Sequence, residues 1–322
     1  RCRAAMSVTG DGWPLAPVTI NLSPATLPKA GSHYDLAIAA AVAAARGRCD
    51  PESLVGLVMF GELSLDGRVR GVRGLLPALL AARAKQVTRA VVPAVQLREA
   101  SLVEGMVVYG VSDLADLFSV LAGGPGALPG PPAAEPGPVA SPPDLADVVG
   151  QEEAKWALEV AAAGRHHLYP DLDDDEALEV SAIHSLCGIN LDGGLVRRPP
   201  YADPHHSASL ASLVGGGARI AMPGAISRAH RGVLFLDEAP EFAPRVMEAL
   251  RVPLESGRIV LSRSESTAVY PASFQLVLAA NPCPCGLAET PGSDCRCAPM
   301  AVRRYAARVS GPVLDRIDIS QR

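Results

Sequence analysis

The sequence has few aromatic and few charged side chains, and it has no apolar run long enough to cross a membrane. Phe, Trp and Tyr make up 4% of the 322 residues, and 20% of the residues are charged. The hydrophobic cores must therefore be built from Ala, Val and Leu. The best apolar stretch, 36–45, falls far short of the roughly 20 residues that a membrane helix needs. We therefore predict neither a membrane segment nor, at Arg1-Cys2-Arg3, a signal peptide.

The chain also has no excess of basic residues and no even set of cysteines. A net charge of −5 does not indicate a nucleic-acid partner, so any such contact would have to come from local basic loops. Seven cysteines cannot all pair, and four of them lie between residues 283 and 297. This favours a cytoplasmic protein with a metal site over a disulfide framework.

A proline-rich segment divides the chain. Residues 123–143 hold eight of the 29 prolines and a single charge, which is typical of a semi-rigid linker. We therefore expect one domain over 1–122 and another over 144–322. In the first domain the pattern predicts strands at 17–22, 57–63, 91–93 and 106–109, and helices at 36–45, 75–85 and 112–121.

The second part contains a short apolar run that leads into two acids. Residues 233–236 read as a strand buried in a parallel sheet, and Asp237 and Glu238 follow it directly. Acids at the carboxyl edge of such a sheet can hold Mg²⁺ and polarise a water that attacks a phosphate. Alternatively, they only cap the next helix. Residues 274–280 predict a second buried strand ending at Asn281, with a helix at 245–256 and a hairpin at 258–262 and 266–270.

Several motifs follow one another in a fixed order. They are Asp147–Gln151, Pro204–His206, Gly224–His230, Leu234–Glu238, Leu278–Gly286 and Ser310–Asp318. Together they resemble the magnesium-chelatase-like AAA+ ATPases of the ComM/YifB family. The resemblance implies an α/β fold: an AAA+ core of the P-loop type with a parallel sheet, preceded by a Lon-protease-like (S5-like) α/β domain. It also implies that the C-terminal lid of the family is missing from this chain.

The resemblance assigns roles to individual residues. Asp237 is expected near Mg²⁺, Glu238 is expected to orient the attacking water, and Asn281 is expected to sense the γ-phosphate of ATP. Arg316 corresponds to an arginine finger, which reaches the nucleotide of the neighbouring subunit. Without its flanking motif, Arg316 would read as an ordinary surface arginine.

One family feature is missing from the sequence. The family carries a phosphate-binding loop, G-x-x-x-x-G-K-S/T, directly after residues 166–168, whereas here Leu168 is joined to Tyr169 and no Gly-Lys-Ser/Thr occurs anywhere. Either the loop was lost and the protein is not an ATPase, or the sequence omits a segment at this junction. The second alternative is favoured because Asp237, Glu238 and Asn281 are retained.

The resemblance makes the first domain an unusual relative of Lon. The Lon nucleophilic serine falls at Tyr34 and its lysine partner at Leu76. Ser32 lies nearby, but no Lys or His at a motif-supported position could activate it. We therefore expect a structural or substrate-guiding module without peptidase activity.

Four cysteines form two C-x-C pairs separated by nine residues. Cys283, Cys285, Cys295 and Cys297 would suit a tetrahedral Zn²⁺, although four unligated thiols remain the alternative. His205 and His206 also lie side by side in the sequence. Adjacent histidines in a loop are more often neither ligands nor nucleic-acid contacts, so they receive no role.

Three functions are compatible with these patterns. The resemblance implies a hexameric, ATP-dependent DNA helicase that promotes branch migration during natural transformation or recombination, and Arg197, Arg198, Arg258 and Arg263 are expected to contact DNA phosphates. The alternative is a chelatase-type ATPase that remodels a protein partner and has no nucleic-acid role. If the phosphate-binding loop is truly absent, the third is a catalytically inactive scaffold.

Overall fold

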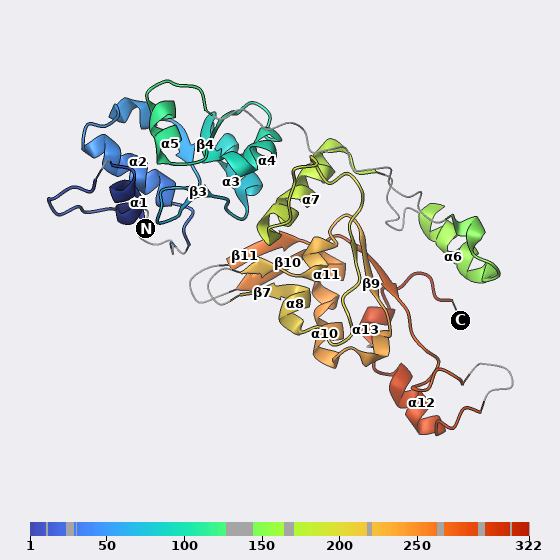
Figure 1. Cartoon of the computed structure of the whole chain (residues 1–322). Helices are drawn as coiled ribbons and strands as arrows, with labels where there is room; N and C mark the ends of the chain where they lie inside the picture. The colour runs from blue at the N-terminus through green and yellow to red at the C-terminus, as the bar shows by residue number, and fades with distance from the viewer. Residues whose placement is uncertain are drawn as a thin grey trace. The chain divides into compact units, whose positions relative to one another are not determined.

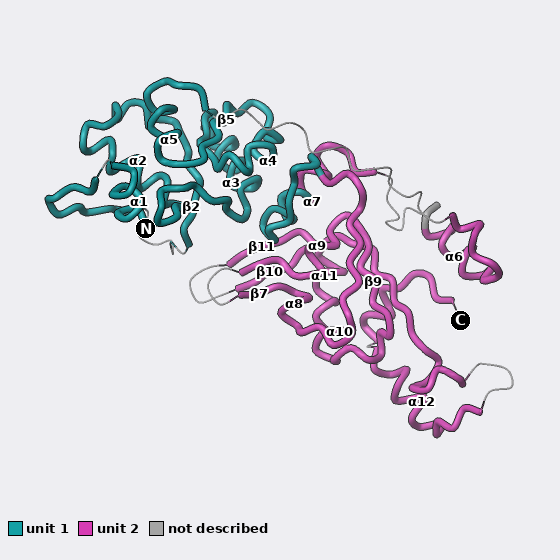
Figure 2. Tube along the Cα trace, in the orientation of Figure 1, with its two compact units in different colours: residues 1–139, 181–195 teal, residues 140–180, 196–322 magenta. Residues whose placement is uncertain are grey.

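The computed structural model divides the chain into two compact units, shown in Figure 2. Unit 1 comprises residues 1–139 and 181–195, and unit 2 comprises residues 140–180 and 196–322. The described residues are 1–10, 12–23, 29, 31–126, 144–163, 171–217, 221–262, 267–288, 294–309 and 311–321. Most of the proline-rich segment lies outside them, so a linker at 123–143 between domains 1–122 and 144–322 stays a prediction.

Unit 1 contains a three-stranded parallel sheet (Figure 1). Its strands are β1 (Leu57–Met59), β4 (Arg89–Pro93) and β5 (Val107–Val111), in the order β1-β4-β5. A small antiparallel hairpin is formed by β2 (Glu62–Leu63) and β3 (Val69–Arg70). The helices are α1 (Cys2–Val8), α2 (Asp35–Ala45), α3 (Leu75–Ala84), α4 (Leu97–Ser101) and α5 (Leu114–Leu121).

The helices of unit 1 follow from local sequence signals. Helix α2 is rich in Ala, the strongest helix former, and it buries Leu36 in the core of the unit. Helix α5 begins after Asp113, whose carboxylate accepts the N–H of Asp116 at 2.9 Å and so caps the helix. Both helices were predicted within two residues of their observed bounds.

The predicted strand at 17–22 does not form. These residues adopt irregular structure, and Val18, Ile20 and Leu22 are exposed. A period-2 apolar pattern gives a strand only where a neighbouring strand supplies hydrogen bonds and a face to bury. No strand pairs with this segment among the described residues, so the prediction is wrong.

Unit 2 is built on a second parallel sheet. Its strands are β6 (Tyr201–Ala202), β9 (Val233–Leu236) and β12 (Gln275–Leu278), with β9 in the centre. Two antiparallel hairpins accompany it, β7 (Gly215–Gly216) with β8 (Met222–Pro223) and β10 (Arg258–Ser262) with β11 (Thr267–Pro271). The helices are α6 (Glu152–Ala163), α8 (Leu210–Val214), α9 (Ala225–Arg228), α10 (Pro244–Ala249), α11 (Arg251–Ser256), α12 (Pro299–Ala306) and α13 (Gly311–Leu314). Helix α7 (Asp174–Cys187) is divided between the units, with residues 174–180 in unit 2 and residues 181–187 in unit 1.

The helix expected at 245–256 is divided into α10 and α11. Pro253 has no N–H to donate to the carbonyl of Ala249, four residues earlier, and its ring crowds that carbonyl. Helix α10 ends at Ala249, the residue whose carbonyl would have accepted this hydrogen bond, and α11 begins at Arg251. None of the helices in the described part of the chain is long and apolar enough to cross a membrane.

Candidate functional site

The carboxyl ends of β9 and β12 form the edge of the unit 2 sheet. The two strands are parallel and in register, with Leu236 opposite Leu278. Beyond the strands, the N–H of Ala279 donates to the carbonyl of Leu236 at 3.0 Å, and the N–H of Ala239 donates to the carbonyl of Ala279 at 2.9 Å. Asp237 and Glu238 therefore leave the sheet beside the segment that carries Asn281, as the two apolar runs predict.

Glu238 is held in an unusual conformation. Its backbone is left-handed, with φ of +51°, which a non-glycine residue rarely adopts. Its N–H donates to Oδ1 of Asp237 at 2.8 Å, and its Oε2 lies 3.0 Å from Nδ1 of His206. Asp237 is exposed, so the sheet edge presents one open carboxylate and one carboxylate engaged by a histidine.

His206 reaches the site through β6. This strand pairs with β9 on the side opposite β12, with Tyr201 beside Val233 and Ala202 beside Leu234. The chain leaves β6 at the same sheet edge and brings His206 to Glu238 four residues later. Sequence reasoning gave His206 no role, because the pairing of β6 with β9 joins segments about thirty residues apart.

Tyr305, on α12, is a second residue that sequence reasoning missed. Its side chain is buried, and this burial raises the pKa of the hydroxyl. The negative charges of Glu241 and Glu238 raise the pKa further, whereas a hydrogen bond with Asn281 lowers it. Asn281 is therefore in contact with Tyr305, and Glu238 is close enough to Tyr305 to be felt electrostatically. Helix α12 thus flanks the same sheet edge.

The contacts of Arg316 are with residues other than Asp237, Glu238 and Asn281. Its guanidinium contacts the carboxylate of Glu255 and the carbonyl oxygen of Pro312, both in unit 2 of its own chain. A different arginine, Arg308, contacts the turn after Glu238: its Nη1 lies 3.1 Å from Glu241 Oε2 and 3.3 Å from the carbonyl of Pro240. The role of Arg316 toward a neighbouring subunit stays a prediction.

The four clustered cysteines meet in space. Their sulfur atoms all lie within 4.8 Å of one another, and three of the separations are 3.3, 3.6 and 3.8 Å. A tetrahedral site with Zn–S bonds of about 2.3 Å places its sulfurs about 3.8 Å apart. Burial alone would raise the pKa of Cys283, but hydrogen bonds from Cys285, backbone N–H groups and Cys295 lower it to about 6. The pKa of Cys297 is instead raised to about 12, mainly by its hydrogen bond with Cys285, and the pKa of Cys295 is raised as well. The number, type and separations of the four donors fit Zn²⁺.

The arginines expected to bind nucleic acid have diverse surroundings. Arg197 and Arg198 are exposed in the segment between α7 and β6, and Arg258 is exposed at the start of β10. Arg197 forms an ion pair of 2.6 Å with Asp174, so a phosphate would have to compete with this carboxylate. Arg263 lies outside the described residues, as does the Leu168–Tyr169 junction.

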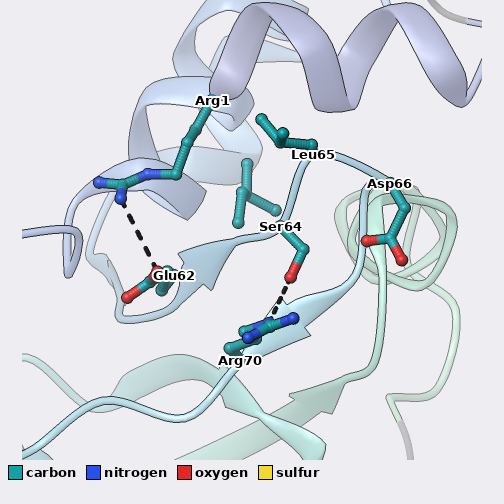
Figure 3. A pocket seen from close by; sticks show the side chains of 7 residues that line it. Arg1, Glu62, Ser64, Leu65, Asp66 and Arg70 are labelled. Atoms are coloured by element: carbon teal, nitrogen blue, oxygen red, sulfur yellow. Dashed lines mark hydrogen bonds and ion pairs between the residues drawn. The ribbon is translucent and has the colours of Figure 1, made fainter.

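Unit 1 offers no serine–lysine pair at the positions that the resemblance indicates. Leu76 is fully buried, Tyr34 is exposed, and Ser32 donates its hydroxyl to the carboxylate of Glu62. A pocket of about 450 Å³ is shown in Figure 3. It is lined by Arg1, Glu62, Leu63, Ser64, Leu65, Asp66 and Arg70, and its arginines are engaged by Glu62 and Ser64.

Comparison with known proteins identifies the family. The family described as "Magnesium chelatase, subunit ChlI" matches residues 144–170 and 167–322, and "Subunit ChlI of Mg-chelatase" matches residues 1–96. An uncharacterized protein of Mycobacterium tuberculosis is 52% identical over 340 residues, covering 99% of this chain and 67% of that protein. The competence protein ComM of Haemophilus influenzae is 39% identical and the uncharacterized protein YifB of Escherichia coli is 42% identical, with 99% of this chain and 67% and 66% of those proteins covered. The chain belongs to the ComM/YifB family of magnesium-chelatase-like AAA+ ATPases.

The family match also bears on the missing loop. It is split into two segments that meet at residues 167–170, the junction where the resemblance places the phosphate-binding loop. The alignments with the relatives extend over 340 to 345 positions, although this chain has 322 residues. The relatives therefore carry segments that this chain lacks. The chain spans about two thirds of the length of these relatives.

Proposed function

We propose that unit 2 is the ATPase core of a ring-forming motor that acts on DNA, and that hydrolysis needs a phosphate-binding loop at the Leu168–Tyr169 junction. The observation that carries the proposal is the shared sheet edge of Asp237, Glu238 and Asn281. These residue types suit a Mg²⁺ ligand, a group that polarises water and a phosphate sensor.

The residues present fit only part of ATP. The exposed carboxylate of Asp237 would hold Mg²⁺, and Glu238 and Asn281 would face the γ-phosphate side. The backbone cradle and lysine that hold the other phosphates do not occur in the sequence. The unchanged chain therefore lacks the groups that bind most of the nucleotide's phosphates. We assign ATP hydrolysis to a chain that carries the phosphate-binding loop.

The DNA part of the proposal rests on the family and on the exposed arginines. One relative is named a competence protein, and we extend to this chain a hexameric ring that promotes branch migration of DNA. Arg197, Arg198 and Arg258 are exposed on unit 2, where they would supply phosphate contacts without a basic net charge. Arg263, near the turn of the β10–β11 hairpin in sequence, belongs to the same proposed set.

The test compares two forms of the full chain. One is unchanged, and the other carries a phosphate-binding loop of the pattern G-x-x-x-x-G-K-S/T inserted at this junction. The unchanged chain should hydrolyse no ATP, whereas the loop-carrying chain should hydrolyse it, and forked DNA should stimulate the rate several-fold. Glu238→Gln in the loop-carrying chain is the matched control: it should keep nucleotide binding and lose turnover.

The DNA arm separates the two candidate functions. Neutralising the four arginines should weaken DNA binding and lower the slope of log K against log salt by about one for each phosphate that the protein no longer binds. The DNA motor would be contradicted if the chain hydrolyses ATP, DNA does not stimulate the rate and no DNA is unwound. That outcome would favour remodelling of a protein partner. Absence of hydrolysis in a folded, assembled, loop-carrying chain would contradict the ATPase itself.

We also propose one Zn²⁺ per chain on the four clustered cysteines. Such an ion would supply no redox chemistry, and it would fix the loop between β12 and α12 as a tetrahedral crosslink. The support is the set of sulfur separations, which approach those of a tetrathiolate site.

A further inference from the structure

The contact between His206 and Glu238 joins two segments that no sequence pattern links. Nδ1 of His206 lies 3.0 Å from Oε2 of Glu238, with 33% and 45% of the two side chains exposed. Both groups are therefore reachable by water, and the pair is not needed to neutralise a charge buried in the core. An exposed ion pair contributes little stability, so its position beside the sheet edge is its most informative property.

Both partners are constrained from several directions. His206 follows β6, which is fixed beside β9 by the pairing of Tyr201 with Val233, and its ring lies 4.0 Å from that of His205. Glu238 is fixed by its left-handed backbone and by the hydrogen bond of its N–H to Asp237. His206 therefore contacts the side chain of a residue, Glu238, whose backbone conformation is already fixed.

We propose that His206 is a positioning residue for Glu238, an inference that rests on the proposed ATPase function. His206 donates an Nδ1–H hydrogen bond to Oε2, which fixes the plane of the carboxylate. The other oxygen, Oε1, remains free to accept a hydrogen bond from the attacking water. His206 keeps its proton throughout and touches neither the nucleotide nor the water. Because His206 follows β6, the position of the catalytic carboxylate then depends on where the end of β6 lies beside β9.

The first test needs no nucleotide and uses the unchanged chain. Neutral histidine normally carries its proton on Nε2, so donation from Nδ1 requires either the other tautomer or the charged ring. With ¹⁵N-labelled histidine at pH 8, the imidazole nitrogen shifts of His206 should report a protonated Nδ1. In Glu238→Ala the Nε2–H tautomer should dominate. The chain has seven histidines, and His206→Asn assigns the signal.

The second test uses the loop-carrying chain and ATP hydrolysis. His206→Ala should lower kcat by at least about tenfold and change KM by less than about twofold, because misplacement of a catalytic group slows chemistry rather than binding. His206→Asn, whose amide N–H can take the place of Nδ1–H, should restore part of kcat. His33→Ala is the matched control: His33 lies in unit 1, where its ring contacts the carbonyl of Arg73, so kcat should stay near that of the unsubstituted chain.

The two tests separate failure of this inference from failure of the proposed function. A loop-carrying chain without hydrolysis would contradict the ATPase, while the tautomer of His206 would still decide whether the contact exists. An Nε2–H tautomer in the unchanged chain overturns the positioning role. An active chain in which His206→Ala leaves kcat unchanged, or lowers it no more than His33→Ala does, overturns it as well.

Discussion

His230 is a buried histidine that links two parts of unit 2. Only 4% of its side chain is exposed; Nε2 lies 3.2 Å from Oε2 of Glu179 on α7, and Nδ1 accepts the N–H of Ser273 at 3.0 Å. Burial lowers the pKa of the ring, although the contact with Glu179 partly opposes this. The neutral ring, with its proton on Nε2, therefore satisfies both partners just before β9 and β12.

This environment predicts a pH dependence of local stability. Because the pKa of His230 is lowered in the folded state, the unfolded state binds more protons between that pKa and the ordinary value of about 6.5. The contribution of His230 is complete above about pH 6.5 and is lost as the pH falls through this window. Hydrogen exchange in β9 and β12, corrected for intrinsic rates, should show less protection at pH 5.5 than at pH 7.5.

The variant His230→Gln serves as the comparison. It cannot titrate, so the loss of protection between pH 7.5 and pH 5.5 should be smaller than in the unsubstituted chain. His205→Gln, which replaces an exposed histidine, should leave the loss unchanged. An equal loss of protection in all three proteins would contradict a titrating role for His230.

Individual site residues differ in how far the sequence can place them. Asp237 and Glu238 follow a short apolar run that predicts a strand of a parallel sheet, so their position at the sheet edge was predictable. Asn281 was predictable for the same reason. His206 and Tyr305 were not, because their contacts depend on the β6–β9 pairing and on where α12 packs, and no local pattern encodes either.

At the scale of elements, the loop between β12 and α12 carries the four cysteines directly after Asn281. Cys283 is buried and its carbonyl accepts the N–H of Gly286 at 2.9 Å. The purified full chain should contain about one zinc per molecule by elemental analysis. Cys283→Ser should lose the metal, since a neutral hydroxyl is a much poorer zinc ligand than a thiolate.

The same loop offers a control within the chain. Cys49→Ser removes a cysteine that lies in unit 1 and outside the cluster, so the zinc content should stay the same. Purification without chelators that yields metal-free protein would leave four unligated thiols as the better description.

Elements with strong local signals were predicted well. The bounds of β9 match the predicted strand, and α2 and α3 begin or end within one residue of expectation. The two failures have different causes, one tertiary and one local. The segment 17–22 finds no partner strand among the described residues, and Pro253 divides a helix that its apolar pattern alone would continue. Parallel pairing in both units joins strands that are distant in sequence, so the strand order could be expected only from the family.

At the scale of the whole molecule, the proposed site is incomplete in one chain. Arg316 contacts Glu255 and Pro312 of its own chain, and within the described residues it forms no ion pair with Asp237 or Glu238. If Arg316 is the arginine finger, as the resemblance implies, a nucleotide at the sheet edge would receive it from a neighbouring subunit. In a closed ring with head-to-tail interfaces, each subunit presents the same surface to the next, so one missing group recurs at every interface.

Mixing two inactive variants of the loop-carrying chain tests this arrangement. Glu238→Gln lacks the group that polarises water, and Arg316→Ala lacks the proposed finger, so each should be inactive alone. A random equimolar mixture places an intact Glu238 opposite an intact Arg316 at about one interface in four. ATP hydrolysis should then recover to about a quarter of the unsubstituted rate if interfaces act independently. Mixed rings that assemble, as shown by sedimentation, yet recover no activity at any ratio would place Arg316 outside the active site.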